Sequence, residues 1–150
     1  MTAPSNAEIQ TSIITKLKAT AAITSQLDSG AVEIREDQWQ GTEFDYPNIR
    51  VRMIRNEPNG DTAGCSSCIF EVSIMVFSQS YSSFEADTIT GIINASLNLK
   101  SFMANGLLIT LRTTNMIPAV RYNSKTMGTS SDIRTWRAEC LMEGLANKTS

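Results

Sequence analysis

The stretch Phe70-Glu71-Val72-Ser73-Ile74-Met75-Val76-Phe77-Ser78 decides the fold, together with the helical pattern that begins shortly after it at Ser83. Side chains in the stretch alternate with the two-residue period of a β-strand. Phe70, Val72 and Ile74 are apolar, and we expect them to face the core. The opposite side of the strand is half apolar, so we expect that it is partly covered.

A second strand is predicted immediately upstream, over Asn48–Arg55, and the two strands form a hairpin. Pro47 precedes it, and proline is tolerated at the beginning of a strand. The connection, about Asn56–Ser67, is rich in turn residues and long for a hairpin. Long loops between strands are often functional, so this connection is a candidate for contact with a partner.

Two amphipathic helices are predicted from apolar residues at helical spacing. The first covers Glu8–Lys18, and Asn6 is its expected N-cap. The second covers Ser83 to about Leu99, and Ser82 with Glu85 fits a capping box. Thr20–Leu27 continues the first helix or forms a separate helical turn.

Shorter alternating segments predict further strands over Ala31–Arg35, Leu107–Thr113, Met116–Tyr122 and Ile133–Glu143, the third at a sheet edge because it holds Pro118. Helices and strands do not alternate regularly enough for a parallel sheet. We therefore predict an α+β fold, an antiparallel β-sheet with two or three helices packed on one face. A single domain of residues 1–150 is expected, with a core of about 7–145 and short flexible termini that include the tail Ala146–Ser150.

Composition limits the classes of function. The chain is 41% hydrophobic and only 19% charged, which is typical of a folded protein with buried contacts between subunits. Its net charge of −2 argues against a module that grips nucleic acid. Apolar runs are too short to span a bilayer, and the first residues show no secretory signal pattern. We therefore expect synthesis in the cytoplasm and no membrane partner.

The sequence nominates no catalytic, cofactor or metal site. It contains no histidine, which is the usual general base and the commonest metal ligand. Cys65 and Cys68 have the spacing of a metal or redox pair, but only Cys140 could join them, and a structural zinc site needs four ligands. We interpret the pair as ordinary loop thiols and predict that the protein is not an enzyme.

An acidic loop precedes the second strand and contains Glu36, Asp37, Glu43 and Asp45. Paired carboxylates can catalyse glycoside hydrolysis or bind calcium. Their spacing matches no calcium-binding loop, and one loop does not define a substrate cleft. The favoured interpretation is a solvated loop.

Arg50 and Arg52 share a strand face, and Arg137 projects from the last strand. These arginines suit either a phosphate-binding stripe or ion pairs across strands. Carboxylates at strand spacing, Glu71, Glu139 and Glu143, favour the ion pairs. The predicted partner interface, drawn from exposed or half-apolar positions, comprises Trp39, Arg50, Arg52, Ile54, Asn59, Gly60, Asp61, Met75 and Phe77.

The two tryptophans have different expected roles. Trp39 lies in a polar loop, and it either anchors a partner or folds back on the sheet edge. Trp136 alternates with core positions of the last strand, so we expect it to pack in the interior.

The order of these elements resembles the tail-terminator (tail-completion) proteins of long-tailed bacteriophages over nearly the whole chain, from about Ala7 to Leu145. The resemblance lies in the helix Glu8–Lys18, the strand Ala31–Arg35, the segment Pro47-Asn48-Ile49-Arg50-Val51, the strand Phe70–Ser78 that runs into a helix, and the late strand Ile133–Leu141. The family has no invariant motif that can be matched. The long connection and the cysteine pair have no counterpart in it.

This resemblance implies a structural virion protein without catalytic activity or cofactors. It implies a homohexameric ring that caps the finished tail tube, ends tail polymerisation and joins the tail to the head-completion proteins of the neck. DNA would pass through the ring without specific binding. The implied location is the tail or neck of the virion, after assembly in the host cytoplasm.

Two other interpretations remain open. The chain could be another ring-forming virion protein, a head-completion or tail-tube protein, in which the long Asn56–Ser67 connection would stack on the next ring. A small cytoplasmic enzyme is the third interpretation, and it is disfavoured because the sequence shows no candidate catalytic residues.

Overall fold

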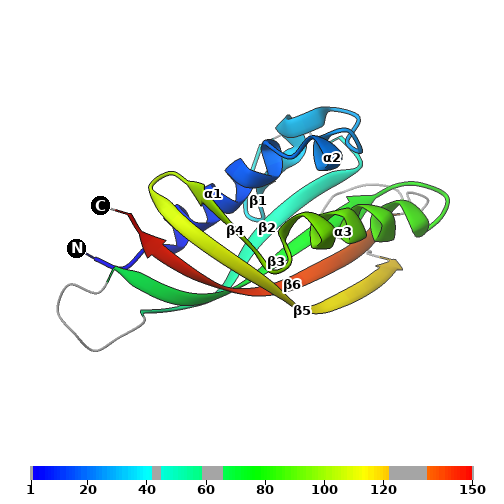
Figure 1. Ribbon diagram of the computed structural model, residues 1–150. Coiled ribbons are helices and arrows are strands. Elements are labelled where there is room, and N and C mark those ends of the chain that lie inside the picture. Colours follow the sequence, from blue (N-terminus) through cyan, green and yellow to red (C-terminus); the bar gives the residue numbers. More distant parts are fainter. Residues whose placement is uncertain (1, 42–44, 59–65, 122–134, 150) are drawn as a thin grey trace.

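The computed structural model describes residues 2–41, 45–58, 66–121 and 135–149. In these residues six strands form one sheet in the order β1-β2-β3-β6-β5-β4, and the helices lie on one of its faces (Figure 1). The α+β class is confirmed. The helical elements are α1 (Asn6–Lys18), α2 (Ala21–Thr24), the 3₁₀ helix η1 (Gly30–Glu33) and α3 (Phe84–Leu97). The strands are β1 (Ile34–Glu36), β2 (Asn48–Pro58), β3 (Ser67–Ser78), β4 (Lys100–Ala104), β5 (Leu107–Arg121) and β6 (Trp136–Lys148).

The sheet is mixed rather than fully antiparallel. The short strand β1 runs parallel to β2, with Ile34 opposite Ile49, while every other neighbouring pair of described strands is antiparallel. The predicted hairpin is confirmed as β2 and β3. Its ladder is longer than expected, because it continues to Pro58 opposite Cys68. Residues 56–58 and Ser67 therefore belong to the strands and not to the connection.

The core lies between the helices and the sheet. Phe70, Val72 and Ile74 are fully buried on the helix-facing side of β3, as predicted. Buried apolar residues of α1, α3 and all six strands join them in one cluster. Trp136 packs against this cluster, also as predicted, and its indole N–H donates to the Ser80 carbonyl at 3.0 Å. Each large buried side chain contributes about 1.5–3 kcal/mol of transfer free energy, so this single interface carries most of the stability.

Both helix starts differ from prediction. The N-cap of α1 is Ser5 rather than Asn6, and Ser5 forms a capping box with Glu8. The Glu8 N–H donates to Ser5 Oγ at 3.2 Å, and the Ser5 N–H donates to Glu8 Oε2 at 2.7 Å. The expected capping box at Ser82 does not form. The Glu85 carboxylate instead accepts from the Ser78 hydroxyl at 2.6 Å, which ties α3 to the end of β3.

The segment predicted as a strand over Ala31–Arg35 begins as a helical turn. Gly30 has φ +64°, a conformation that glycine adopts without cost, and η1 follows immediately. Only Ile34–Glu36 is extended. The turn places the Glu33 carboxylate in the interior, where a regular strand would leave it at the sheet surface.

The segment after α3 also differs from prediction. The helix ends at Leu97, Leu99 has φ +58°, and the unpredicted strand β4 follows. A two-residue turn, Asn105-Gly106, joins β4 to β5 with φ +52° and +75°. Two positive φ values are the mark of a type I′ hairpin turn, for which Asn-Gly is a preferred pair.

The remaining strands are longer than predicted. The two strands expected around residues 107–122 form one strand, β5, whose register is irregular between Thr113 and Asn115 and between Ile117 and Val120. Pro118 lies in the second irregularity, on a stretch of β5 that β4 does not pair. Residues 146–148 of the predicted tail belong to β6, and Ala146 is fully buried, so the core extends beyond residue 145. Ile133 falls outside the described residues.

Candidate assembly surfaces

The sheet face that points away from the helices carries a row of four paired charges. Arg55, Glu71, Glu143 and Arg112 lie opposite one another on β2, β3, β6 and β5. The guanidinium of Arg55 lies 3.1 Å from the Glu71 carboxylate, and Arg112 pairs with Glu143. The expectation of ion pairs across strands is therefore correct in kind. The partners differ, because Arg55 and Arg112 take Glu71 and Glu143, while Arg137 pairs with Glu139 of its own strand at 3.3 Å.

Arg50 is buried in an ion cluster at the β1 edge of the sheet. Its Nη1 donates to the Glu33 carbonyl at 2.8 Å and to the Ile49 carbonyl at 3.0 Å. Its Nη2 lies 3.5 Å from the Glu33 carboxylate, which Arg35 approaches from the other side at 3.6 Å. Burial lowers the pKa of Arg50, and the neighbouring Glu33 carboxylate opposes that shift. This cluster fixes β1 and η1 to the sheet.

Trp39 folds back on the same edge. The Arg35 guanidinium lies 3.4 Å from the centroid of the Trp39 ring, a cation–π arrangement, and the indole is half-buried. Of the two roles expected for Trp39, this geometry is that of folding back. A contact between Trp39 and a partner stays a prediction.

The other predicted interface residues vary in exposure. Arg52 and Ile54 are exposed on β2, and Ile54 lies at the register shift between Met53 and Arg55. Met75 is buried and Phe77 is half-buried on β3. The predicted turn residues Asn59, Gly60 and Asp61 lie outside the described residues. The part of the predicted interface that is both described and accessible therefore consists of Arg52 and Ile54, while Trp39 and Phe77 are partly accessible.

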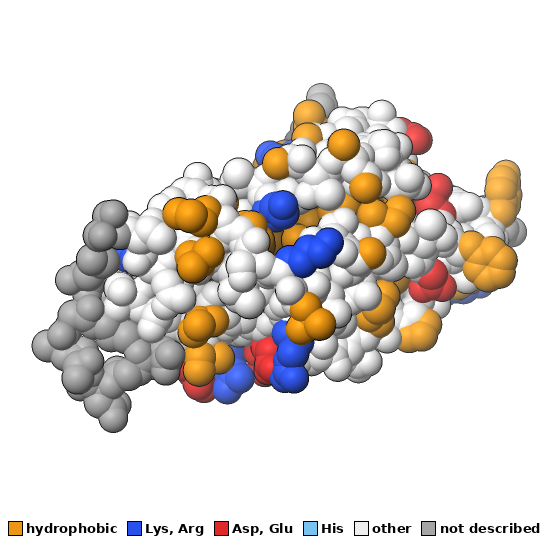
Figure 2. Space-filling model, in the orientation of Figure 1, with side chains coloured by type: hydrophobic (Ala, Val, Ile, Leu, Met, Phe, Trp, Pro, Cys, Tyr) orange, Lys and Arg blue, Asp and Glu red, His pale blue; other side chains and the backbone are white. Residues whose placement is uncertain are grey.

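The largest exposed apolar side chains were not predicted as interface residues. Tyr81, in the turn between β3 and α3, is 90% exposed, and Phe84, the first residue of α3, is 76% exposed. At the other end of the sheet, Met103 on β4 is 66% exposed. Figure 2 shows hydrophobic side chains in small groups over the visible face and at its right-hand end. Phe84 fits the apolar spacing of the second predicted helix, but it is the first residue of α3 and does not join the buried side of that helix. For Tyr81 and Met103, an exposed apolar position in a turn or a short edge strand looks the same in sequence as a buried one.

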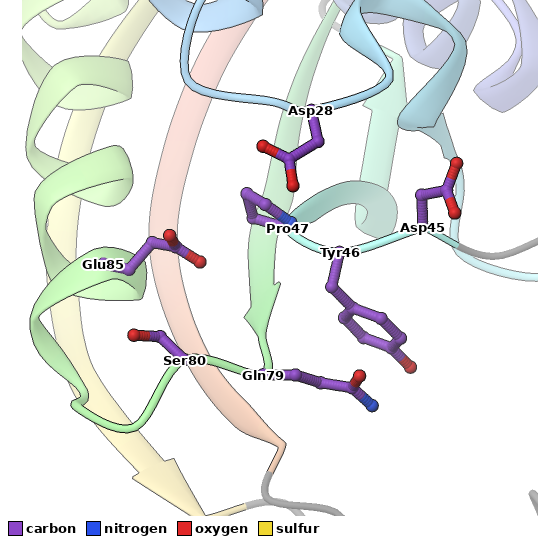
Figure 3. A pocket seen from close by; sticks show the side chains of 7 residues that line it. All are labelled: Asp28, Asp45, Tyr46, Pro47, Gln79, Ser80 and Glu85. Atoms are coloured by element: carbon purple, nitrogen blue, oxygen red, sulfur yellow. The ribbon is translucent and has the colours of Figure 1, made fainter.

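An open cleft of about 450 Å³ lies where the segment after α2 meets the end of β3 and the start of α3 (Figure 3). It is lined by Asp28, Asp45, Tyr46, Pro47, Gln79, Ser80 and Glu85. Asp45 accepts from the Ser29 hydroxyl and Glu85 from that of Ser78. Among the described residues no group of three or more His, Cys, Asp or Glu side chains could hold a metal ion. The cleft is therefore a solvated acidic surface.

The described cysteines are interior residues. Cys68 is fully buried in β3, which corrects its assignment as a loop thiol, and Cys65 lies outside the described residues. Cys140 is fully buried in β6, and burial raises the pKa of its thiol. Because the thiolate is the reactive form, burial lowers the reactivity of the Cys140 thiol.

Helices long and apolar enough to cross a membrane are absent from the described residues. No model of a known protein family matches the chain, and no curated protein matches it in sequence. Solved structures do match its fold. One is a protein of the "virion of native gene transfer agent (GTA) particle", with a TM-score of 0.62 and 12% identity, over 93% of this chain and 94% of that chain. A second, whose name describes no function, has a TM-score of 0.56 and 14% identity over 97% and 98% of the two chains. At these identities the likeness establishes the fold.

Proposed function

We propose that this protein is a structural component of a phage-like virion, and that it forms a hexameric ring at the head-proximal end of the tail tube. The observation that carries the proposal is the fold shared with a protein of the gene transfer agent virion over nearly the full length of both chains. The order of elements, which resembles the tail-terminator proteins of long-tailed bacteriophages, supports the same role from the sequence side.

In this role the ring ends polymerisation of the tail-tube protein and presents the tail to the head-completion proteins of the neck. DNA passes through the ring without being gripped. The small net charge of −2 is compatible with that passage, because a surface that binds DNA tightly is strongly basic. The protein works by contact and carries out no reaction.

A tail-tube protein is the second candidate, and one feature favours it. The β2–β3 hairpin is long, and β1 pairs only with residues 49–51 of β2. In the described residues, most of β2 up to Pro58 is therefore an open sheet edge. Such an edge can accept a strand from a neighbour. In a tube this hairpin would contact the next ring.

Depletion of the protein during particle assembly separates the two candidates. Loss of a tail terminator leaves tails of uncontrolled length that are not joined to heads, and resupplying the protein restores joined tails of normal length. Loss of a tube protein leaves no tube. Electron micrographs that show normal, joined tails after depletion would contradict both roles.

A further inference from the structure

Two separate apolar surfaces lie at opposite ends of the molecule. The first, which we term the stripe, consists of Met103 on β4, Leu108 on β5, Leu145 on β6 and Ile69 on β3. The second, which we term the aromatic turn, consists of Tyr81 and Phe84. Neither surface belongs to the core cluster.

The strand register makes the stripe continuous. Met103 lies opposite Leu108, and Leu145 lies opposite Ile69. Leu108 and Leu145 are diagonal neighbours, because Leu108 pairs with Asn147. Diagonal neighbours on adjacent strands are about 7–8 Å apart, within reach of long side chains. The stripe therefore crosses four strands on the face opposite the helices, with Met103 66%, Ile69 40% and Leu145 36% exposed.

The border of the stripe has the character of an interface rim. Next to Ile69 and Leu145 runs the row of Arg55, Glu71, Glu143 and Arg112, whose four charges form two ion pairs. Glu57, which lies opposite Ile69, also pairs with Arg55 at 3.0 Å, so each charge on this border has a partner of opposite sign and the border carries one net negative charge. An apolar centre with a polar border is typical of protein–protein contacts.

The aromatic turn is the chemically matching surface at the other end. Tyr81 and Phe84 follow the end of β3, while Ile69 lies near its beginning, and the strand between Ile69 and Ser78 is about 30 Å long. Aromatic residues supply most anchors of protein interfaces. One projecting aromatic surface and one flat apolar surface, on opposite ends of one chain, give a head-to-tail contact, whereas a single self-complementary surface gives a two-fold dimer. A repeated head-to-tail contact forms a ring where the rotation between copies closes and an open filament where it does not.

We infer that the stripe of one copy binds the aromatic turn of the next copy, and that this junction repeats around the assembly. The inference rests on the proposed ring. The occupant of the stripe is a second copy of this chain because the matching surface is present on the chain itself, and because a net charge of −2 opposes self-association only weakly.

Two double variants test the junction: Ile69→Ser with Leu145→Ser, which removes the β3 and β6 half of the stripe, and Tyr81→Ser with Phe84→Ser, which removes the aromatic turn. All four positions are at least one-third exposed, so circular dichroism and thermal melting should show folded proteins. Val32→Ser, at an exposed position of η1 outside both surfaces, is the matched control.

Sedimentation and native mass spectrometry at high protein concentration give the readout. We expect each double variant alone to stay monomeric and the Val32→Ser control to assemble like the wild type. An equimolar mixture of the two double variants should form one-to-one dimers and nothing larger, because it contains one intact junction. A self-complementary stripe would instead let the Tyr81/Phe84 variant assemble alone.

If the isolated chain is monomeric, a crosslinking experiment in assembled particles tests whether the stripe of one copy contacts the aromatic turn of the next. Leu145→Cys and Phe84→Cys, placed together in one chain, should form disulfides between neighbouring copies on mild oxidation, and either substitution alone should not. Absence of that crosslink, or normal assembly of both double variants, overturns the junction. The proposed virion role is judged separately, by whether the chain is found at the head–tail junction of the particle.

Discussion

Gly144 offers the sharpest test of the packing described above. It lies in β6 opposite Phe70 on β3 and Leu111 on β5. A Cβ added at this position would lie 2.5 Å from Phe70 Cζ and 2.8 Å from the Thr110 carbonyl oxygen. Phe70 is fully buried, and the Thr110 oxygen belongs to the backbone of the sheet, so neither atom can move away cheaply.

We expect Gly144→Ala to destabilise the protein by about 2–3 kcal/mol, the upper part of the range for overpacking in a core. For a chain of 150 residues this corresponds to a fall in melting temperature of roughly 6–9 °C. Denaturant titration and calorimetry measure the loss. Phe70→Leu, introduced together with Gly144→Ala, should restore about 1 kcal/mol of it, because the shorter side chain removes the ring atoms from the clash.

Gly91 is the matched control. It lies inside α3, and a Cβ there would meet no atom within 4 Å. Gly91→Ala should therefore stabilise the protein by about 0.5–1 kcal/mol through its better helix propensity. If Gly144→Ala were as stable as the wild type, the close approach of Phe70 to β6 would be wrong, and with it the strand register in the core.

Three further perturbations test other parts of the structure. Ser5→Ala should cost about 1 kcal/mol by removing the α1 cap, while Asn6→Ala should change stability by less than about 0.5 kcal/mol; thermal melting separates the two assignments of the N-cap. Hydrogen bonds from Ser5 lower the pKa of Glu8. The Glu8 carboxylate therefore stabilises the fold above about pH 4.5, and this stabilisation is lost as the pH falls through the lowered pKa. A Glu8→Gln variant whose stability falls with acid as steeply as that of the wild type would argue against the capping box. Arg50→Met should cost about 3 kcal/mol, because it leaves the Glu33 carboxylate buried with only Arg35 beside it, and an equilibrium unfolding curve that matches the wild type would show that Arg50 is not buried in an ion cluster.

The sequence predicted the parts of the fold whose patterns are long and regular. Alternation along β3 identified both its strand character and its buried side, because residues 70–76 are apolar at every second position. The hairpin partner β2 and the two longer helices followed from equally regular patterns. The α+β class could be derived from these elements alone.

Short helices and strands whose conformation depends on tertiary contacts could not be predicted from sequence periodicity. Extended backbone was expected from residue 31, but a 3₁₀ turn forms there and brings Glu33 to Arg50, which no local pattern reports. β4 was missed although Asn105-Gly106 is a strong hairpin signal, so that strand could have been predicted from its turn. The N-cap of α1 was placed one residue late because Ser5 and Asn6 are both good caps, and only Ser5 has a Glu three residues later.

The candidate interface was harder to predict than the fold. Strand alternation placed Arg50 and Met75 on the outer face, yet both are buried, Arg50 within its ion cluster with Glu33. The most exposed apolar residues, Tyr81 and Phe84, lie in a turn and at a helix start, where the pattern carries no information about burial. Residues that contact a partner are recognised by the exposure of their side chains to solvent, and that exposure is a property of the folded chain.

The most direct test of the proposed role is a symmetric electron cryo-microscopy reconstruction of the particle that contains this chain. Our account predicts density for six copies in a single ring at the junction of head and tail, with the tail tube on one side and neck proteins on the other. Density for the chain in rings repeated along the whole tail would contradict the terminator role and favour a tube protein. A complete particle without the chain would contradict a structural role in the virion.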